Sequence, residues 1–280
     1  MADFALPALF ALFLWWFSTG AILYLDGLAR TSFRWSMLGA TALAMLAHYG
    51  LWASSADASV SGAYVAFMCG LAIWGWHEMS FLMGFVTGPR RDPSPADAGS
   101  WRRFGHATQT VLYHELAILA SVLLVLALTW EGDNQVGTWT FIVLWLMRVS
   151  AKLNLHFGVP NLNTQLLPEH LGYLRPFLTC KPMSVLFPVT VTLATVVAAE
   201  IVGEALSSVP GSFERVGCVL LAALMALAIL EHWLLVLPLP DTALWRWALG
   251  SRAEPVSSES RSLAMTPAGP ATIRPRWSRA

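Results

Sequence analysis

Seven long runs of apolar residues constrain the fold more than any other feature of this sequence. Crossing the hydrocarbon core of a bilayer takes about 20 mostly apolar residues in a helix, because about 30 Å is spanned at about 1.5 Å per residue. Backbone polar groups inside lipid must also be satisfied within the segment. The sequence therefore predicts an all-α, polytopic membrane protein with a bundle of seven transmembrane helices. The predicted spans are Pro7–Leu25, Trp35–Ser54, Ala63–Val86, Thr108–Thr129, Val136–Leu155, Met183–Ile201 and Gly217–Leu237.

The basic residues lie almost entirely on one side of such a bundle. If the odd-numbered helices run from side A to side B, Arg215 is the only lysine or arginine on side A. The positive-inside rule then places side B in the cytoplasm and the N-terminus outside. Removing or adding one helix would scatter the basic residues over both sides, so the charge pattern also favours seven spans. Side B carries Arg30, Arg34, Arg90, Arg91, Arg102, Arg103, Arg175, Lys181, Arg246, Arg252, Arg261, Arg274, Arg276 and Arg279.

The composition changes near the end of the chain. The whole chain is 56% hydrophobic and 12% charged, whereas an ordinary soluble domain carries about 25% charged residues. Residues 246–280 are instead rich in Ser, Pro, Arg and Ala, a composition typical of disordered segments. We therefore predict a transmembrane domain at 1–245, surrounded by membrane lipid, and a basic, disordered cytoplasmic tail at 246–280. The formal net charge is zero, and no nucleic-acid partner is predicted.

Ionisable residues gather at one depth inside the predicted helices. Such residues are costly in a membrane, and they mark either a functional site or ion pairs that hold helices together. Four of them, on four different helices, lie about 9 to 13 Å from the cytoplasmic helix ends at about 1.5 Å per residue. Arg148, Lys152 and His156 recur every four residues, so they share one helix face. The predicted polar chamber consists of His77, Glu78, His114, Glu115, Arg148, Lys152, His156, Glu231 and His232.

The carboxylates of this chamber are the natural partners of its two cations. Glutamates on three helices would neutralise Arg148 and Lys152, because an unpaired charge at this depth costs several kcal/mol. The loop after the fifth predicted helix adds polar side chains on the same side, and we predict that it folds over the chamber as a lid. The candidate counter-ions are Glu78, Glu115 and Glu231, and the candidate lid residues are Asn161, Asn163, Glu169 and His170.

Three interpretations of the chamber stay open: a structural network of ion pairs, a metal site, and a histidine that ligates a tetrapyrrole. Histidine and carboxylate are the ligand types of iron, manganese and zinc. Neighbouring residues diverge by about 100° on a helix, however, and the chain has no H-x-x-x-H or E-x-x-H repeat. Tryptophans near the chamber would suit a flat macrocycle. The candidate metal ligands are His77, His114, His156 and Glu231.

Seven strings in this sequence are long and unusual: Trp76–Phe81, Gly88–Arg91, Tyr113–Leu116, Asn134–Phe141, Leu146–Asn154, Val159–Asn163 and Leu167–Leu171. They resemble one family, the PuhE-type photosynthetic complex assembly proteins of purple phototrophic bacteria. The family is encoded beside a reaction-centre subunit, which implies a place in the bacterial inner (intracytoplasmic) membrane. It also implies a role in bacteriochlorophyll supply, with photosynthetic complex subunits or pigment-synthesis proteins as partners. The resemblance carries over no catalytic residue.

Two functions follow as expectations. The first is a non-enzymatic assembly factor for the reaction centre and light-harvesting complexes, as the resemblance implies. The alternative is a metal-dependent membrane enzyme that modifies a tetrapyrrole or isoprenoid precursor in the His/Glu chamber. Nucleotide and serine-hydrolase motifs such as G-x-x-x-x-G-K-[ST], G-x-G-x-x-G and G-x-S-x-G are missing from the sequence.

Overall fold

A computed structural model describes residues 2–95, 97–162, 167–239 and 241–250. Every regular element in this part of the chain is helical, and its only β contact is an isolated bridge between Val159 and Cys180. The all-α prediction is confirmed. The short elements are η1 (Arg30–Ser32), η3 (Glu169–Phe177), η4 (Asp241–Trp245) and α8 (Arg246–Leu249).

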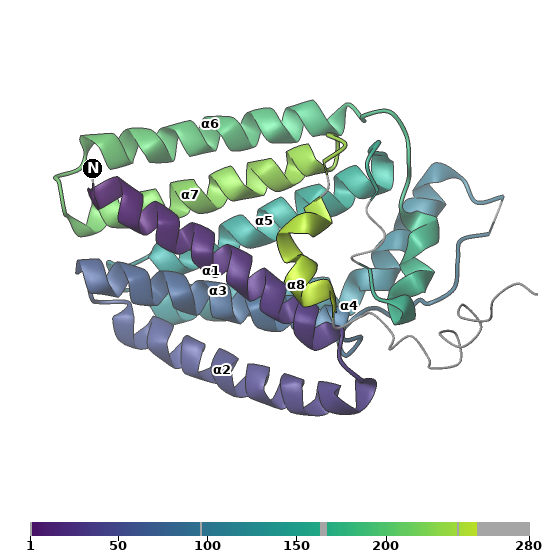
Figure 1. Ribbon diagram of the computed structural model, residues 1–280, viewed down its shortest axis with the longest axis horizontal. Coiled ribbons are helices and arrows are strands. Elements are labelled where there is room, and N and C mark those ends of the chain that lie inside the picture. The colour runs from purple at the N-terminus through teal and green to yellow at the C-terminus, as the bar shows by residue number, and fades with distance from the viewer. Residues whose placement is uncertain (1, 96, 163–166, 240, 251–280) are drawn as a thin grey trace, which may run out of the picture.

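Seven long helices run back and forth along the long axis of the molecule (Figure 1). Each corresponds to one predicted stretch, but several boundaries differ by three residues or more, and the local sequence accounts for some of them. The third helix stops at Leu82, because Gly84 turns the chain with a φ of +81°. The fourth begins at Ser100, eight residues before the apolar run, and the seventh begins at Phe213 because Ser212 caps it. The long helices are α1 (Ala2–Asp26), α2 (Phe33–Ser54), α3 (Val60–Leu82), α4 (Ser100–Thr129), α5 (Val136–Phe157), α6 (Leu186–Ser207) and α7 (Phe213–Leu234).

Six of these helices are long and apolar enough to cross a membrane: α1, α3, α4, α5, α6 and α7. This indicates a multi-pass membrane protein. Helix α2 has 22 residues, enough length for a span, but it is not among the six. Its sequence includes Arg34, Thr41 and His48, which lower its mean hydropathy. Seven spans are therefore not confirmed, and the place of α2 is taken up under the proposed function.

Helix α3 lies at the centre of the bundle, in contact with α1, α2, α5 and α7. More than half of its apolar window is buried, the largest share among the six candidate spans. It approaches α5 closely, because a Cβ built on Gly70 would stand 2.5 Å from the backbone oxygen of Gly137. Small residues let membrane helices approach in this way, with backbone against backbone. This contact sets the separation between the helices that carry Glu78 and Arg148.

The last described residues pack against the first helix. The rings of Trp15 and Trp245 lie 5.4 Å apart, and those of Trp16 and Trp247 lie 5.7 Å apart. Trp16 Nε1 also donates to the carbonyl of Leu244 at 2.9 Å. Residues 246–249, predicted as the start of a disordered tail, thus form helix α8. Residues 251–280 lie outside the described part of the chain.

Candidate functional site

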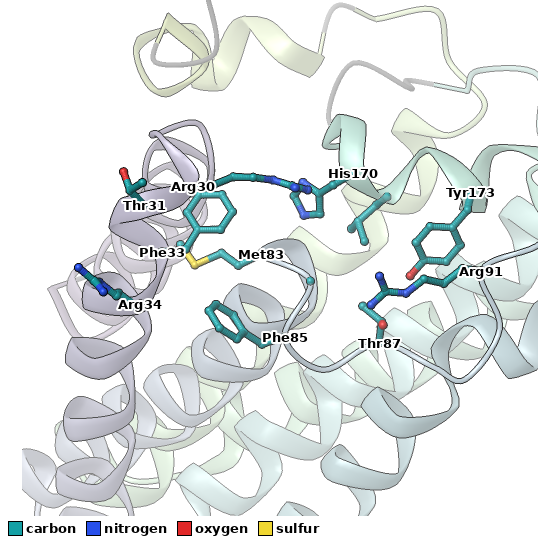
Figure 2. Close-up of a pocket in the computed structure, with 12 residues that line it drawn as sticks. Arg30, Thr31, Phe33, Arg34, Met83, Phe85, Thr87, Arg91, His170 and Tyr173 are labelled. Carbon is teal, nitrogen blue, oxygen red and sulfur yellow. The ribbon is translucent and has the colours of Figure 1, made fainter.

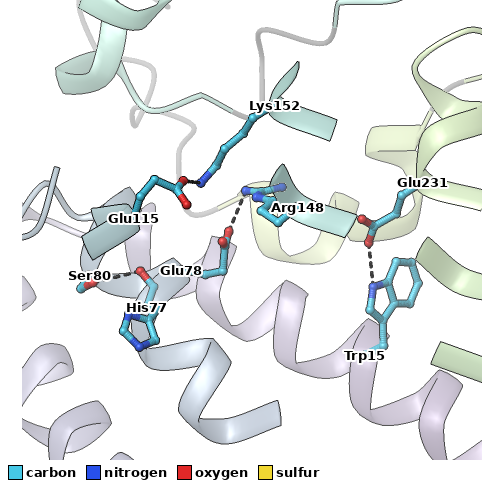
Figure 3. A network of polar contacts seen from close by, with 8 residues as sticks. All are labelled: Trp15, His77, Glu78, Ser80, Glu115, Arg148, Lys152 and Glu231. Carbon is cyan, nitrogen blue, oxygen red and sulfur yellow. Dashed lines mark hydrogen bonds and ion pairs between the residues drawn. The ribbon is translucent and has the colours of Figure 1, made fainter. Parts of the chain in front are cut away.

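Two ion pairs join α5 to its neighbours (Figure 3). Arg148 Nη2 lies 2.6 Å from Glu78 Oε2 on α3, and Lys152 Nζ lies 2.6 Å from Glu115 Oε1 on α4. The four-residue spacing places both cations on the same face of α5. Both glutamates are among the three counter-ions that the sequence suggests, without a specific pairing, and the two pairs tie three helices together through charge-assisted hydrogen bonds.

The third carboxylate has a different partner. Glu231 Oε1 on α7 accepts a hydrogen bond of 2.8 Å from Trp15 Nε1 on α1. Arg148 lies between Glu78 and Glu231 in Figure 3. All three side chains line a cavity of about 280 Å³, which we call the inner cavity. Arg148 keeps 38% of its side-chain surface accessible, whereas its partner Glu78 keeps 12%. The inner cavity thus presents one guanidinium and two carboxyl groups inside the bundle.

The histidines of the predicted chamber do not line this cavity. His77 Nε2 is hydrogen-bonded to Ser121 Oγ at 2.8 Å, and His232 Nε2 to Ser150 Oγ at 2.9 Å. The ring of His156 packs 5.4 Å from that of Phe104. The nine predicted chamber residues are therefore divided between the inner cavity, a second ion pair and separate histidine contacts. They do not form a single open chamber.

His114 is a buried residue whose ring nitrogens have no hydrogen-bond partner among the described residues. Its exposed fraction is 0%, and both Nδ1 and Nε2 are without a partner. Its ring lies 4.7 Å from that of Phe81 and 6.4 Å from that of His77. Most buried polar atoms in proteins are hydrogen-bonded, so this ring is an exception.

The candidate metal ligands are dispersed. Among the described residues, no three His, Cys, Asp or Glu side chains come together as a metal-binding group. Glu231 binds Trp15, His77 binds Ser121, and His156 lies against Phe104. This geometry does not support the predicted metal site. A volume of about 280 Å³ is also at the lower end of ligand pockets, which suits part of a ligand better than a whole macrocycle.

Two of the predicted lid residues, Asn161 and His170, bind helix ends, and neither lines the inner cavity. Asn161 Nδ2 donates to the carbonyls of Leu234 and Leu237 at 2.8 and 2.9 Å. His170 Nε2 donates to the carbonyl of Leu82 at 2.7 Å. Both side chains satisfy carbonyls that a helix leaves free at its C-terminus. Glu169 is exposed, and Asn163 lies outside the described residues.

Three partners in this region escape a reading of the sequence. Trp15 contributes its indole N–H to Glu231, and Ser121 and Ser150 contribute hydroxyls to buried histidines. No spacing rule links Trp15 to a carboxylate 216 residues away. The two serines lie within long apolar helices, where a hydroxyl gives no signal of which neighbour it contacts.

Comparisons with known proteins give one family and one relative. The family model DUF3623, described as a protein of unknown function, matches residues 1–256. A protein of Rhodobacter capsulatus is 42% identical over 258 residues, which cover 90% of this chain and 93% of the relative. That relative is described as an uncharacterized 30.4 kDa protein in the puhA 5′ region. No solved structure matches the chain.

Proposed function

The chain belongs to the DUF3623 family, and on that premise we propose that it is a membrane assembly factor for the bacterial photosynthetic apparatus. The observation that carries this proposal is the relative in the puhA 5′ region, which lies in a photosynthesis gene cluster. The similarity extends over 90% of this chain, so it is not confined to one motif. The strings that resemble PuhE-type proteins support the same role.

The arrangement of the helices suits a scaffold for other membrane helices. Ion pairs and the contact between Gly70 and Gly137 hold the centre of the bundle together. Large apolar side chains remain exposed on the outer helices, including Leu193 and Val196 on α6. Such faces contact lipid or client helices. We propose that nascent photosynthetic subunits or pigment-synthesis proteins dock there, and that docking supports the supply of bacteriochlorophyll.

We further propose that α2 is a seventh span in the bacterial inner membrane, with the N-terminus outside and the C-terminus cytoplasmic. The side chains of α2 that are exposed are largely apolar, as expected of a helix surrounded by lipid. The single basic residue of side A, Arg215, donates from Nε to the carbonyl of Ala205 at 3.1 Å. Arg215 therefore satisfies a carbonyl at the end of α6. This local role explains a single basic residue on side A without contradicting the charge pattern. The large apolar side chains exposed on α2 are Trp35, Leu38, Leu43, Met45, Leu46, Tyr49 and Trp52.

Reporter fusions test this topology. Alkaline phosphatase, which is active only outside the cytoplasm, is expected to be active after Asp57 and inactive after Ala29, because α2 separates these positions. A fusion after Pro95 is the control, since it lies on the same side as Ala29 when α2 and α3 both cross. Equal activity at Asp57 and Ala29 would show that α2 does not span.

Gene deletion tests the proposed function. In a phototrophic host, loss of the gene is expected to lower the near-infrared absorbance of reaction-centre and light-harvesting complexes several-fold, and the wild-type gene should restore it. A respiratory membrane enzyme measured in the same membranes is the control. Unchanged levels of the pigment-protein complexes under phototrophic growth would refute the assembly role.

A second function, that of a membrane enzyme acting on a tetrapyrrole or isoprenoid precursor, rests on the inner cavity. Glu78 and Glu231 supply this cavity with carboxyl groups that can act as acid or base, and Arg148 supplies a cation. The deletion strain complemented with Glu231→Gln distinguishes the two functions. If the protein is an enzyme, this strain should accumulate one pigment precursor although the variant protein is present at normal levels. A scaffold would show no such precursor.

A further inference from the structure

A second cavity opens at the basic end of the bundle, between the start of α2, the turn after α3, and η3 (Figure 2). Its volume is about 500 Å³, and it shares no lining residue with the inner cavity. We call it the outer cavity. Its chemistry is set mainly by Arg30, Phe33, Phe85, Arg91, His170 and Tyr173.

The outer cavity is cationic. Three arginines and one histidine are among its 12 lining residues, and none of the 12 is acidic. Figure 2 shows Arg30 reaching across the cavity toward His170, and Arg91 beside Tyr173, whereas Arg34 points away along the outer side of α2. Neither Arg30 nor Arg91 is within ion-pair distance of a carboxylate in the described part of the chain. Both guanidinium groups therefore lack a carboxylate partner among the described residues.

Tyr173 adds a hydrogen-bond donor. Its hydroxyl is buried and has no hydrogen-bond partner among the described residues. In Figure 2 this hydroxyl points toward Arg91 and Thr87. A buried hydroxyl usually has a partner in a folded protein. An anion held by Arg91 would accept a hydrogen bond from Tyr173 at the same place.

The walls of the cavity are fixed by contacts within the fold. His170 is held by its bond to the Leu82 carbonyl, and its ring lies 6.1 Å from that of Phe33. Gly84, with φ of +81°, brings the following turn so close that a Cβ there would stand 3.2 Å from the His170 ring. The wall of the cavity that carries His170 is therefore a packed part of the fold.

Part of the remaining lining is apolar. Phe33, Met83 and Leu171 are buried beneath the charged groups, and Phe85 is 54% exposed at the rim. The cavity lies where two candidate spans end, at Asp26 and Leu82, which is the depth of lipid headgroups. It therefore combines an anion site with an apolar wall at the membrane surface.

We propose that the outer cavity binds the phosphate group of a ligand with an apolar chain, between Arg30 and Arg91. Guanidinium groups match phosphate oxygens in geometry and charge. The Tyr173 hydroxyl donates to the same phosphate, and the apolar chain lies along Phe33 and Phe85. The phosphate can come from an anionic phospholipid or from a free phosphorylated compound. This site does not depend on the proposed assembly role.

Lipid binding to the full-length protein in detergent tests the proposal. Phosphatidylglycerol and diacylglycerol, which has the same apolar chains but no phosphate, are titrated, and bound lipid is counted by native mass spectrometry. The variant Arg30→Gln/Arg91→Gln is expected to bind phosphatidylglycerol at least ~10-fold more weakly than wild type, about 1.4 kcal/mol. The control Arg102→Gln/Arg175→Gln removes two exposed arginines that do not line the cavity, and it should stay within ~2-fold.

Tyr173→Phe is a second variant, which leaves both arginines in place. It removes only one hydroxyl, so it disturbs the fold less than the double substitution. It is expected to weaken phosphatidylglycerol binding several-fold. Competition by inorganic phosphate would support the site and point to a free phosphorylated ligand, whereas binding of phosphatidylglycerol without such competition would support it as a lipid site. Equal binding of diacylglycerol, or equal loss in the control variant, would overturn the proposal.

Discussion

Replacing Arg148 by methionine is expected to lower the free energy of unfolding by about 3–5 kcal/mol. The variant leaves the carboxylate of Glu78 without its partner at 2.6 Å, with only 12% of that side chain accessible. A stranded charge is far more costly than a missing pair, because its desolvation is no longer offset. Titration with SDS in mixed micelles measures the loss.

A double-mutant cycle separates the pair from the packing of each side chain. Glu78→Gln/Arg148→Met removes both charges, and it is expected to be more stable than Arg148→Met alone. Glu115→Gln/Lys152→Met gives the same comparison for the second pair on α5. If the losses from Glu78→Gln and Arg148→Met simply add, the two side chains do not stabilise one another and the pair is not a structural device.

The ion pairs were predictable because few solutions exist for charges inside a membrane helix. Arg148 and Lys152 are four residues apart, so they share a face, and carboxylates at similar depth on other helices are their only plausible partners. The same logic failed for Glu231, whose oxygen accepts from Trp15. Depth can be counted from a sequence, but the rotation of each helix about its axis cannot.

The histidines show this limit most clearly. His77 follows Trp76 and precedes Glu78, and helical spacing alone lets it face the cavity or the neighbouring helix. The structure turns it toward Ser121 on α4, while Glu78 faces Arg148. The predicted metal site required histidines of several helices to converge. Whether the histidines converge is decided by how the helices pack. Among the described residues, no such group of metal ligands forms.

The lid and the outer cavity depend on loop geometry. Asn161 and His170 were predicted to belong to a lid over the chamber, but their carbonyl partners belong to the ends of α7 and α3. Arg30 and Arg91 are 61 residues apart in the sequence, and in the sequence analysis they served only to predict the orientation of the bundle in the membrane. The turn at Gly84 and the position of η3 bring them to one cavity.

Gly137→Ala is expected to destabilise the bundle by about 2 kcal/mol or more, although alanine is the better helix former by about 1 kcal/mol. Its Cβ would stand 2.5 Å from the carbonyl oxygen of Ala66 and 2.3 Å from Leu51 Cδ1. The leucine can change its rotamer, but the backbone of α3 cannot yield without moving Glu78 relative to Arg148. Helices α3 and α5 must therefore separate.

Gly203→Ala is the matched control for this prediction. Gly203 lies within α6, is exposed, and has nothing within 4 Å of a built Cβ. The control gains helix propensity without a clash, so its stability should stay equal to wild type or rise by up to about 1 kcal/mol. SDS titration of both variants compares them directly. Equal stability of the two variants would mean that α3 and α5 are not held at the separation that the contact with Gly70 implies.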